Sequence, residues 1–356
     1  MGRRMITAWI ATGLLLAAAH PAAAAHRPDQ EHLEGDEPVS QALAWSGWSS
    51  AKDTREDVVL GRSDAFPDSL ASGMLQGALA APLLLTPGNV LDPRVRVELA
   101  RLEATTVHIL GGESAISATV EQSLTAQGYT VKRYAGSSRV GTALAVAKAH
   151  TDFNVGADRE AVLARAFGEG SSGFADALGA GALSAQWALP MLLTPSNSLD
   201  DSVAKFLRDE EIERVYLAGG TAALSAGVEA QLTAMGIEVV RISGADRAAT
   251  AVAMVEPRRI GADDVTTVIL TEGYADAAWA SGFAAAFPAV RQYRNADGST
   301  NPGVGPEWKP IVLAQGATLP PATAAFLQSV PDDTKLLCAP GVTLAACDLA
   351  QEYIAS

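Results

Sequence analysis

Short apolar runs alternate with alanine-rich segments along most of this chain. From Asp57 onward, "DVVL" is followed by the helix-length segment 67–80, then by "PLLLT" and by segment 92–102. The alternation continues through "VHIL", segment 117–127 and "TVKRY". Runs of β-branched residues and leucine predict buried strands, and the longer alanine-rich segments predict helices. Strands and helices that take turns form right-handed crossovers, so the pattern predicts Rossmann-like parallel sheets with helices on both faces.

The chain also repeats itself at an offset of 108 residues. "PLLLTPGNVLD" at 82–92 returns as "PMLLTPSNSLD" at 190–200. An insertion of five residues in one loop, "AFGEGSSGF", shifts the register upstream of this stretch. Self-similarity at a fixed distance predicts tandem copies of one module. The matched pairs include Thr86 with Thr194, Leu99 with Leu207, Gly111-Gly112 with Gly219-Gly220, Ser117 with Ser225, Gly136 with Gly244, Arg139 with Arg247 and Thr142 with Thr250.

A third, more divergent copy follows the first two. "TVILTEGYADAA" at 267–278 repeats the first strand and an aromatic-x-Asp step. "PIVLAQGATLPPATAAFL" at 310–327 repeats the second strand at an offset of 228. Ala339-Pro340 stand where the first two copies have paired glycines, and the chain ends before any counterpart of Arg139. The sequence therefore predicts three modules, the last of them degenerate.

The first 25 residues read as an export signal. They combine a basic start, an apolar run at 6–19 and a small-residue stretch at 22–25, which predicts cleavage before His26. No other segment is long and apolar enough to cross a bilayer, so we expect a secreted protein without a membrane span. The expected organisation is a signal peptide at 1–25, a disordered linker at 26–44, repeat 1 at 45–149, repeat 2 at 150–255 and repeat 3 at 256–356.

The charge of the chain limits its partners. The formal net charge is −14, and removal of the signal with Arg3 and Arg4 lowers it to about −16. An acidic surface repels phosphate backbones, so nucleic acid is a poor partner for the body of the protein. An anionic polymer could be held only by a local basic patch or through bridging cations.

The two cysteines, Cys338 and Cys347, both lie in the last twenty residues. An exported chain meets non-reducing surroundings, which permits a disulfide. Two small buried apolar residues are an equally good interpretation, because the sequence does not fix the distance between them.

Four motifs together resemble the cell wall binding repeat 2 family of Gram-positive bacteria. They are "FPDSL", "PLLLTP", "ILGGESAIS" and the step from Gly136 to Arg139, in copies of about a hundred residues. The resemblance covers about 300 residues and implies a pseudo-threefold arrangement of Rossmann-like modules that holds proteins non-covalently on anionic wall polymers. The family's Asp-Arg-aromatic step is incomplete here, since Val140 follows Arg139 and Ala248 follows Arg247. Ahead of repeat 1, "AWSGWSSAKDT" only faintly resembles the Gly-to-Arg motif.

The candidate binding residues recur in corresponding places. Asp68, Asp176 and Asp276 each follow a strand and open a helix, where they either cap that helix or line the crevice at the carboxyl ends of the strands. Thr86 and Thr194, at the ends of the second strands, are further ligand candidates. Recurrence alone predicts a shared role and leaves both interpretations open.

The paired glycines Gly111-Gly112 and Gly219-Gly220 stand between a strand and a helix for which Ser117 and Ser225 are the expected N-caps. Glycine there permits positive φ, and the backbone N–H groups either cradle an anion or only complete a tight turn. The GxxxxGK[ST] frame of a nucleotide-binding P-loop is missing.

Arginines are the best candidates for contacting an acidic polymer. Arg139 and Arg247, each with an arginine six residues earlier (Arg133 and Arg241), carry planar guanidinium groups that match phosphate and carboxylate oxygens. In an acidic protein, a recurring arginine could equally be locked to an aspartate inside the interface between modules.

Two loops offer further candidates. An insertion at 290–309 carries Arg291 and Trp308, which either touch saccharide or belong to a solvated loop. The glycines of "FGEGSSGF" at 168, 170 and 173 have the G-x-G-x-x-G spacing of a dinucleotide site. They lie in the loop insertion, and the next strand ends without an acid for the ribose, so a nucleotide-binding enzyme stays a minor alternative.

We therefore expect a secreted wall-binding protein that is not an enzyme and that has no cofactor and no metal site. The chain shows no HExxH motif, no G-x-S-x-G elbow and no zinc-ligand spacing. Its expected partner is an anionic cell-wall polymer. An interaction protein that tunes a peptidoglycan hydrolase is the second alternative.

Overall fold

The computed structural model describes residues 30–50, 54–149, 159–168, 175–255, 265–275, 279–285, 290–291 and 307–356. The predicted signal peptide, Asp276 and most of the glycine-rich loop at 168–173 lie outside these ranges. Within them, no helix has both the length and the apolar character that crossing a membrane requires.

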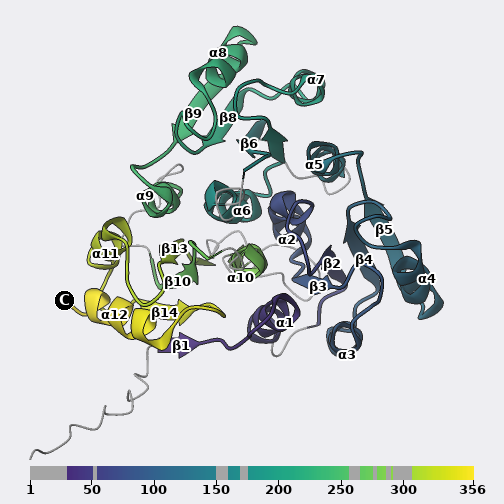
Figure 1. The fold of residues 1–356 in the computed structure, drawn as a ribbon, viewed down its shortest axis with the longest axis horizontal. Coiled ribbons are helices and arrows are strands. Elements are labelled where there is room, and N and C mark those ends of the chain that lie inside the picture. Colours follow the sequence, from purple (N-terminus) through teal and green to yellow (C-terminus); the bar gives the residue numbers. More distant parts are fainter. Residues whose placement is uncertain are drawn as a thin grey trace, which may run out of the picture.

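Three four-stranded parallel sheets define modules 1, 2 and 3 (Figure 1). The strand order is β3-β2-β4-β5 in module 1, β7-β6-β8-β9 in module 2 and β1-β14-β10-β13 in module 3. Parallel neighbours need a crossover between them, and the alanine-rich segments supply these crossovers as helices. The predicted fold class of three Rossmann-like modules is confirmed.

Module 1 follows the predicted alternation, and its strands β2, β3 and β4 are buried along most of their lengths. Its elements are β2 (Asp57–Arg62), the 3-10 helix η1 (Ser69–Ala71), α2 (Gly73–Leu79), β3 (Leu83–Thr86), α3 (Pro93–Arg101), β4 (Thr106–Leu110), α4 (Ala118–Ala126), β5 (Thr130–Tyr134) and α5 (Arg139–Lys148).

Module 2 repeats this series. Its elements are β6 (Glu160–Arg165), α6 (Ala175–Trp187), β7 (Met191–Thr194), α7 (Asp201–Asp209), β8 (Arg214–Ala218), α8 (Ala226–Ala234), β9 (Glu238–Ile242) and α9 (Arg247–Ala253).

Module 3 draws on both ends of the chain. Its elements are β1 (Gln30–His32), α1 (Pro38–Ser49), β10 (Thr267–Glu272), α10 (Trp279–Ala284), β11 (Val290–Arg291), β12 (Glu307–Trp308), β13 (Ile311–Ala314), α11 (Pro321–Leu327), β14 (Lys335–Cys338) and α12 (Leu344–Ile354). Strands β11 and β12 form a separate antiparallel pair at the base of the predicted insertion.

The predicted disordered linker at 26–44 is wrong for the part of it that the structure describes. Strand β1 pairs in parallel with β14, so that Gln30 lies opposite Leu336 and His32 opposite Cys338. Helix α1 then begins after Glu37, whose side chain accepts hydrogen bonds from two backbone N–H groups of the first turn. The segment is short and polar, and its partner strand is some 300 residues away, so no local pattern marks it.

A cyclic arrangement of helices joins the modules. Helix α5 packs on β7, α9 on β13, and α1 on β3, so each sheet receives the helix that follows the previous sheet. Helices α2, α6 and α10 meet near the centre of the molecule (Figure 1). The three modules are therefore related by a pseudo-threefold axis, and the N-terminal segment closes the ring.

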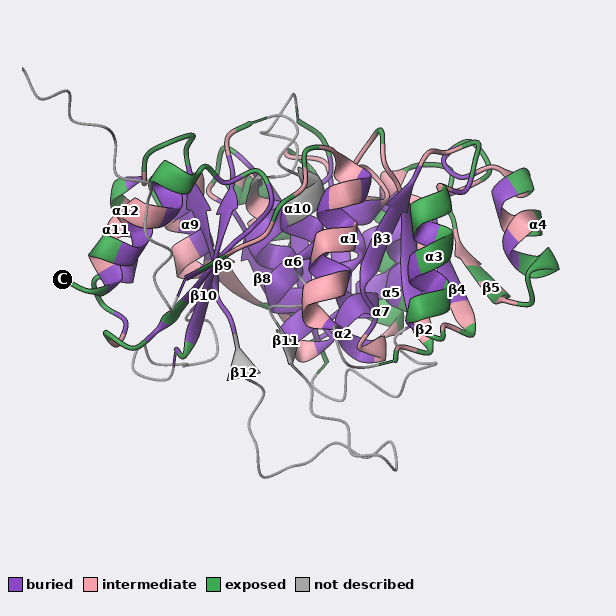
Figure 2. Cartoon of the chain, turned by 90° about the horizontal axis from the view of Figure 1, so that it is seen from below, coloured by how far each residue is buried: buried purple, intermediate pink, exposed green. Residues whose placement is uncertain are grey.

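Small residues allow the central helices to approach closely. A Cβ atom added to Gly77 in α2 would lie 1.9 Å from the carbonyl oxygen of Ala185 in α6. Close packing of backbones at this contact buries α6, whereas α3 and α4 keep exposed outer faces (Figure 2). Alanine and glycine residues thus allow the central helices to pack this closely.

The open alternative for the two cysteines is resolved. Cys338 at the end of β14 and Cys347 in α12 form a disulfide, with their Cα atoms 6.1 Å apart. This bond ties the last helix to the strand on which β1 pairs.

Candidate ligand-binding junctions

The first candidate site lies at junction 1/2, where α5 leaves module 1 and packs on module 2. Ser138 caps α5 by accepting a hydrogen bond from the N–H of Gly141, which places Arg139 at the first helical position. Nη1 of Arg139 donates to the carbonyl oxygen of Ala166, 2.8 Å away, immediately after β6. The recurring arginine therefore bridges two modules through a backbone carbonyl rather than through an aspartate.

Aromatic rings flank the guanidinium of Arg139. Its Cζ atom is 5.8 Å from the ring centroid of Phe66 and 5.2 Å from that of Phe167, within the range of cation–π attraction. Phe167 is 48% exposed, one of few large apolar side chains exposed to this extent in the described part of the chain. Burial lowers the pKa of Arg139 and the charge of Asp68 opposes this shift, but an arginine stays protonated.

Asp68 and Gly111 meet beside this arginine at the carboxyl ends of β2 and β4. Crossovers leave β2 and β4 in opposite directions, and such switch points are where open α/β sheets bind ligands. Gly111 has φ +90°, and a Cβ atom built on it would lie 2.6 Å from Oδ2 of Asp68. The side chain of Asp68 makes no capping bond to its helix, so the capping interpretation is wrong for this residue.

Junction 2/3 repeats this geometry. Nη1 of Arg247 donates to the carbonyl oxygen of Gly273 at 2.8 Å, and its Cζ atom lies 4.8 Å from the ring centroid of Tyr274. Gly219 has φ +97°, and its added Cβ would again lie 2.6 Å from a carboxylate oxygen, here of Asp176. Two junctions therefore share an arginine, an aromatic ring and an aspartate.

At both junctions the charges of the aspartate and the arginine interact. Burial raises the pKa of Asp176, and the positive charges of Arg165 and Arg247 oppose this shift. The aspartate and the arginine of each junction therefore lie close enough for their charges to interact.

The threonines and the glycine N–H groups have structural roles. Thr86 and Thr194 are fully buried, and each hydroxyl donates to a carbonyl four residues later in its own loop. The N–H groups of Gly111 and Gly219 donate to the last residues of β5 and β9. These two N–H groups are thus not free to cradle an anion, although the predicted positive φ is confirmed at both glycines.

The second glycine of each pair, Gly112 or Gly220, completes the turn. The carbonyl oxygens of both accept backbone hydrogen bonds from residues three and four positions later. Ser117 and Ser225 occupy the predicted N-cap positions of α4 and α8, but their side chains make no capping bond.

Arg133 and Arg241 are engaged within their own modules. Each forms an ion pair, with Glu121 at 2.7 Å and with Glu229 at 2.9 Å, and each donates to the carbonyl of the first glycine of the pair. Both arginines are thus paired with a glutamate of their own module, not with an aspartate between modules, and they brace the glycine turn.

The remaining candidates are only partly described. Asp276 lies outside the described residues. Arg291 and Trp308 fall on β11 and β12, whose register sets Val290 opposite Trp308 and Arg291 opposite Glu307. Of the dinucleotide-like spacing, only Gly168 is described, so the structure does not test that alternative.

Two features of the junctions were not predicted. Phe167 follows the accepting carbonyl directly, and a lone aromatic residue after a strand in a chain with 6% aromatics was the available signal. The counterpart of the Gly136-to-Arg139 step is not in "AWSGWSSAKDT" but at Gly35 to Pro38, ahead of α1.

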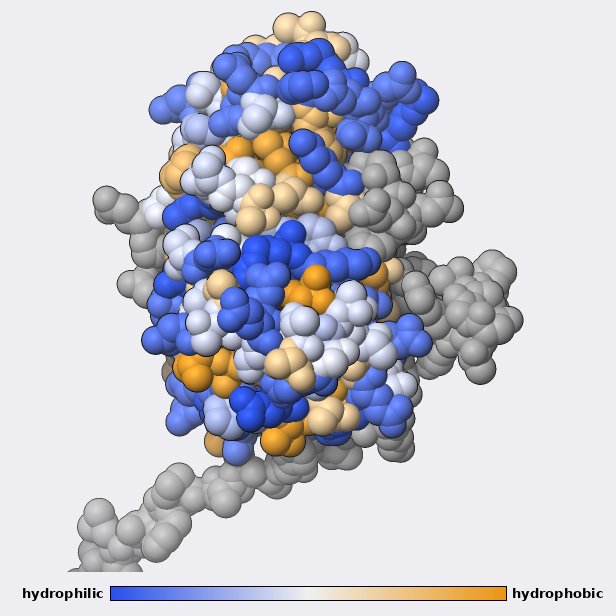
Figure 3. All heavy atoms as spheres, turned by 90° about the vertical axis from the view of Figure 1, so that its right-hand side faces the viewer, coloured by the Kyte–Doolittle hydropathy of each residue, from blue (hydrophilic) through white to orange (hydrophobic). Residues whose placement is uncertain are grey.

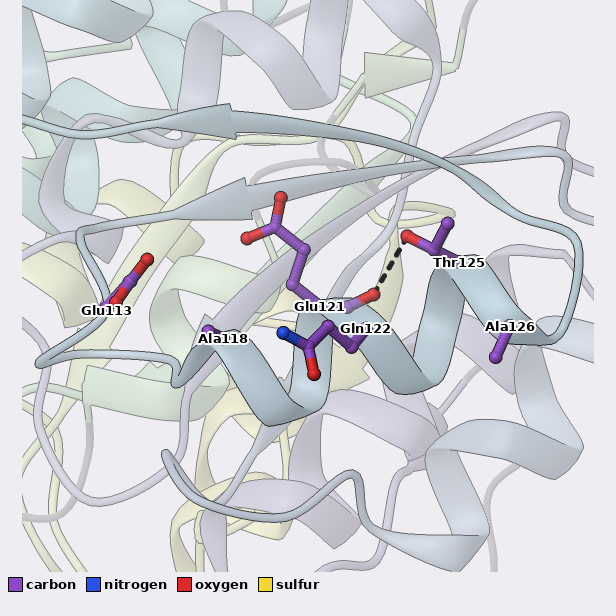
Figure 4. A pocket seen from close by; sticks show the side chains of 6 residues that line it. All are labelled: Glu113, Ala118, Glu121, Gln122, Thr125 and Ala126. Carbon is purple, nitrogen blue, oxygen red and sulfur yellow. Dashed lines mark hydrogen bonds between the residues drawn. The ribbon is translucent and has the colours of Figure 1, made fainter.

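One hollow on the surface of module 1 is less suited to an anion than the junctions are. A shallow hollow beside α4 is lined by acidic and small residues, and Thr125 donates there to the carbonyl of Glu121 (Figure 4). The carboxylate of Glu113 would repel a polyanion there, whereas Glu121 is paired with Arg133. On the face in Figure 3, hydrophilic areas are interspersed with apolar ones, and a group of apolar residues lies in its upper part.

The fold and the junctions define a class of protein, a closed ring of three tandem α/β modules with repeated arginine-containing junctions. The family model named cell wall binding domain 2 matches residues 33–121 and 133–229, which is more than half of the chain. The chain belongs to this family.

Three curated proteins are similar to part of this chain. An N-acetylmuramoyl-L-alanine amidase, LytC, of Bacillus subtilis is 29% identical over 61% of this chain and 40% of its own length. An uncharacterized protein of Pyrococcus horikoshii is 29% identical over 56% of this chain and 59% of its own length. The amidase enhancer of Bacillus subtilis is 28% identical over 62% and 28%. The chain thus matches only part of each relative.

Solved structures share the fold. Cwp8 from Clostridium difficile has a TM-score of 0.75 at 24% identity, covering 92% of this chain and 52% of that one. Cwp6 from the same organism has a TM-score of 0.76 at 19% identity, covering 92% and 48%.

Proposed function

We propose that this protein attaches non-covalently to the bacterial cell wall by binding an anionic wall glycopolymer at junctions 1/2 and 2/3. The observation that carries the proposal is the duplicated set of arginine, aromatic ring and aspartate at the carboxyl ends of the strands. Membership in the cell wall binding family supports a role at the wall. The predicted export signal would bring the protein there.

The chemistry of each junction suits an acidic sugar. Arg139 uses Nη1 on a backbone carbonyl, and no carboxylate forms an ion pair with it among the described residues, so its other N–H groups can meet phosphate or carboxylate oxygens. The exposed ring of Phe167 offers an apolar surface for the face of a sugar ring. Asp68 can accept hydrogen bonds from hydroxyl groups.

The charge of the whole protein shapes this binding. Because the net charge is −14, long-range attraction to a polyanion is absent and affinity has to come from local contacts. Two modest sites on one rigid body gain strength through effective concentration, which commonly adds on the order of 10² or more in affinity. Loss of one site should therefore weaken retention on the wall by about this factor.

We further propose that the chain binds without catalysing a reaction. In the described residues, no cluster of three His, Cys, Asp or Glu side chains is arranged to hold a metal ion. Similarity to part of an amidase and to part of an amidase enhancer supports a second role, in which the wall-bound protein associates with a peptidoglycan hydrolase.

Co-sedimentation with sacculi from the producing bacterium tests the proposal. The purified protein should pellet with intact sacculi and stay in solution after acid extraction of their secondary polymers. Arg139→Ala should weaken binding on the order of 10²-fold through lost avidity. Arg139→Lys keeps the charge but loses the planar donor set, and it should fall between Arg139→Ala and the wild type.

Two surface variants complete this test. Phe167→Ala removes the exposed ring and should weaken binding, whereas Val97→Ala changes a 69% exposed residue on α3 and should not. Equal binding by Arg139→Ala and the wild type, or equal retention on extracted sacculi, would contradict the proposal.

A further inference from the structure

The closing junction, where α1 packs on β3, has the place of a third junction but lacks its arginine. Three helices begin alike, because each follows an extended N-cap residue with a glycine two positions earlier. The first helical residue is Arg139 in α5 and Arg247 in α9, whereas it is Pro38 in α1. Proline offers no guanidinium and no backbone donor.

The receiving side has changed as well. Ser63, Ala166 and Gly273 correspond, because they directly follow β2, β6 and β10, and each donates its N–H to the end of the neighbouring strand. Phe167 and Tyr274 come next in modules 2 and 3.

In module 1 the corresponding residue is Asp64, 61% exposed and paired with Arg62 at 2.6 Å. The Arg62 guanidinium lowers the pKa of Asp64 and so keeps it ionised. A fixed negative charge stands where the other junctions have a ring.

An ion pair also spans a space that is open at junction 1/2. There a hollow of about 510 Å³ separates the starts of α5 and α7, with Ser138 and Ser202 in its lining. The corresponding residues at the closing junction are Glu37 and Arg94, whose side chains meet at 2.8 Å. Arg94 also holds Asp92, again at 2.8 Å, so the two helix starts are tied together.

A second set of bonds fastens α1 to α3 farther along. The hydroxyl of Ser46 donates to the buried carboxylate of Glu98 at 2.5 Å, and Arg101 holds the same carboxylate at 2.6 Å. Arg101 also donates to the carbonyl oxygen of Ser50. The carboxylate of Glu98 thus receives hydrogen bonds from a hydroxyl group and from an arginine. A buried ion pair is stabilising when its hydrogen-bonding groups all have partners in this way.

The glycine turn of the binding junctions is replaced in module 3. The turn from β14 to α12 is two residues shorter than the turn from β4 to α4, and the Cys338–Cys347 disulfide closes it. Gln41 of α1 lies over it, since a Cβ added to Gly341 would lie 3.7 Å from Nε2 of that residue.

From these four differences we infer that the closing junction is a sealed structural joint, and that the protein binds wall polymer at two sites rather than three. The inference rests on the proposed function, because it assigns the number and location of the polymer sites. The N-terminal segment thus closes the ring of modules and contributes no ligand contact.

Binding assays on matched variants test this inference. Arg139→Ala with Arg247→Ala should reduce retention on intact sacculi to the level seen with acid-extracted sacculi. Glu37→Ser with Arg94→Ser, which copies Ser138 and Ser202, should leave retention within about twofold while lowering the melting temperature. The inference would be disproved if the double arginine variant kept avid binding. It would also be disproved if the Glu37→Ser, Arg94→Ser variant stayed folded and lost binding.

A stoichiometry measurement on the wild type avoids any folding defect. Titration calorimetry with wall-polymer fragments of one or two repeat units should give two fragments per chain. Three fragments per chain would overturn the inference while leaving the proposed function intact. No binding by the wild type to sacculi or fragments would overturn the proposed function, and this inference with it.

Discussion

Modules 1 and 2 are each built from one continuous stretch of chain, whereas module 3 borrows its edge strand from the opposite end. In module 1, β4 and β5 are joined by α4. In module 3, β14 instead pairs with β1, and Gln30 reaches the side chains of Cys347 and Asp348, 317 and 318 residues away. A repeat chain that closes into a ring has to join its two ends, and the difference shows where it does so.

This difference explains why the contacts between residues far apart in sequence are concentrated at the closing junction. Neighbouring modules along the chain are held by helices that follow directly from the preceding sheet, so little entropy is lost in bringing them together. Closure of the ring orders a loop of about 300 residues, and such closure costs entropy that grows slowly with loop length. The buried Trp45 of α1, the Arg94 ion pairs and the disulfide all lie at this joint.

The largest expected effect comes from breaking the core of the joint. Trp45 in α1 is 1% exposed, and Trp45→Ala should lower the free energy of unfolding by about 3–5 kcal/mol. Gly47→Ala is a matched control, because an added Cβ there meets nothing within 4 Å, and it should stabilise the helix by up to about 1 kcal/mol. Urea denaturation measures both, and equal stabilities would mean that α1 does not hold the ring.

Loss of the disulfide should have the next largest effect. The bond closes a loop with a sequence separation of 9, and its removal in Cys338→Ala with Cys347→Ala should cost about 2–3 kcal/mol by the chain-entropy estimate. A reducing agent should lower the melting temperature of the wild type to about that of the variant. It should leave the melting temperature of the variant unchanged. If a reducing agent also lowered the melting temperature of the variant, the loss of stability would have a cause other than the disulfide.

The smallest expected effects concern the pH dependence of stability. They contrast Asp176 of junction 2/3 with Asp64 of the closing joint. The pKa of Asp176 is raised above the ordinary 3.8, so its ionisation costs stability as the pH rises through that value and on through the raised pKa. Asp176→Asn should therefore be more stable than the wild type at neutral pH, and this difference should vanish below about pH 3.

Asp64 should show the opposite sign. Its pKa is lowered by Arg62, so it contributes stability above the ordinary value of 3.8, and this contribution is lost as the pH falls through the lowered pKa. Asp64→Asn should be slightly less stable than the wild type at neutral pH, because the pair is exposed and screened. Melting temperatures at the two pH values check both variants, and shifts of the same sign would contradict the contrast.

Local patterns identified much of the fold. The apolar runs at 83–86 and 191–194 form β3 and β7, as their residue pattern predicts. Gly111 and Gly219 have the positive φ that their position after a strand predicts. These features depend on residues close in sequence, so a single chain carries enough information to predict them.

The candidate site was predictable only in part. Recurrence marked Asp68 and Arg139 together with their counterparts, and the structure brings each pair to one junction. It also separates Arg133 and Thr86 from the junction, since both serve their own loop or turn. An arginine on an open surface and an arginine that braces a turn look alike in sequence, because their partners are distant residues.

The sequence by itself determined the module, its number of copies and the chemical types at the strand ends, because strand alternation and repetition are local properties. Only the tertiary structure decided that the ring closes through β1 and α1, and that one of three equivalent junctions carries a proline and an ion pair. Those outcomes depend on contacts between residues up to some 300 positions apart, which no short pattern can encode.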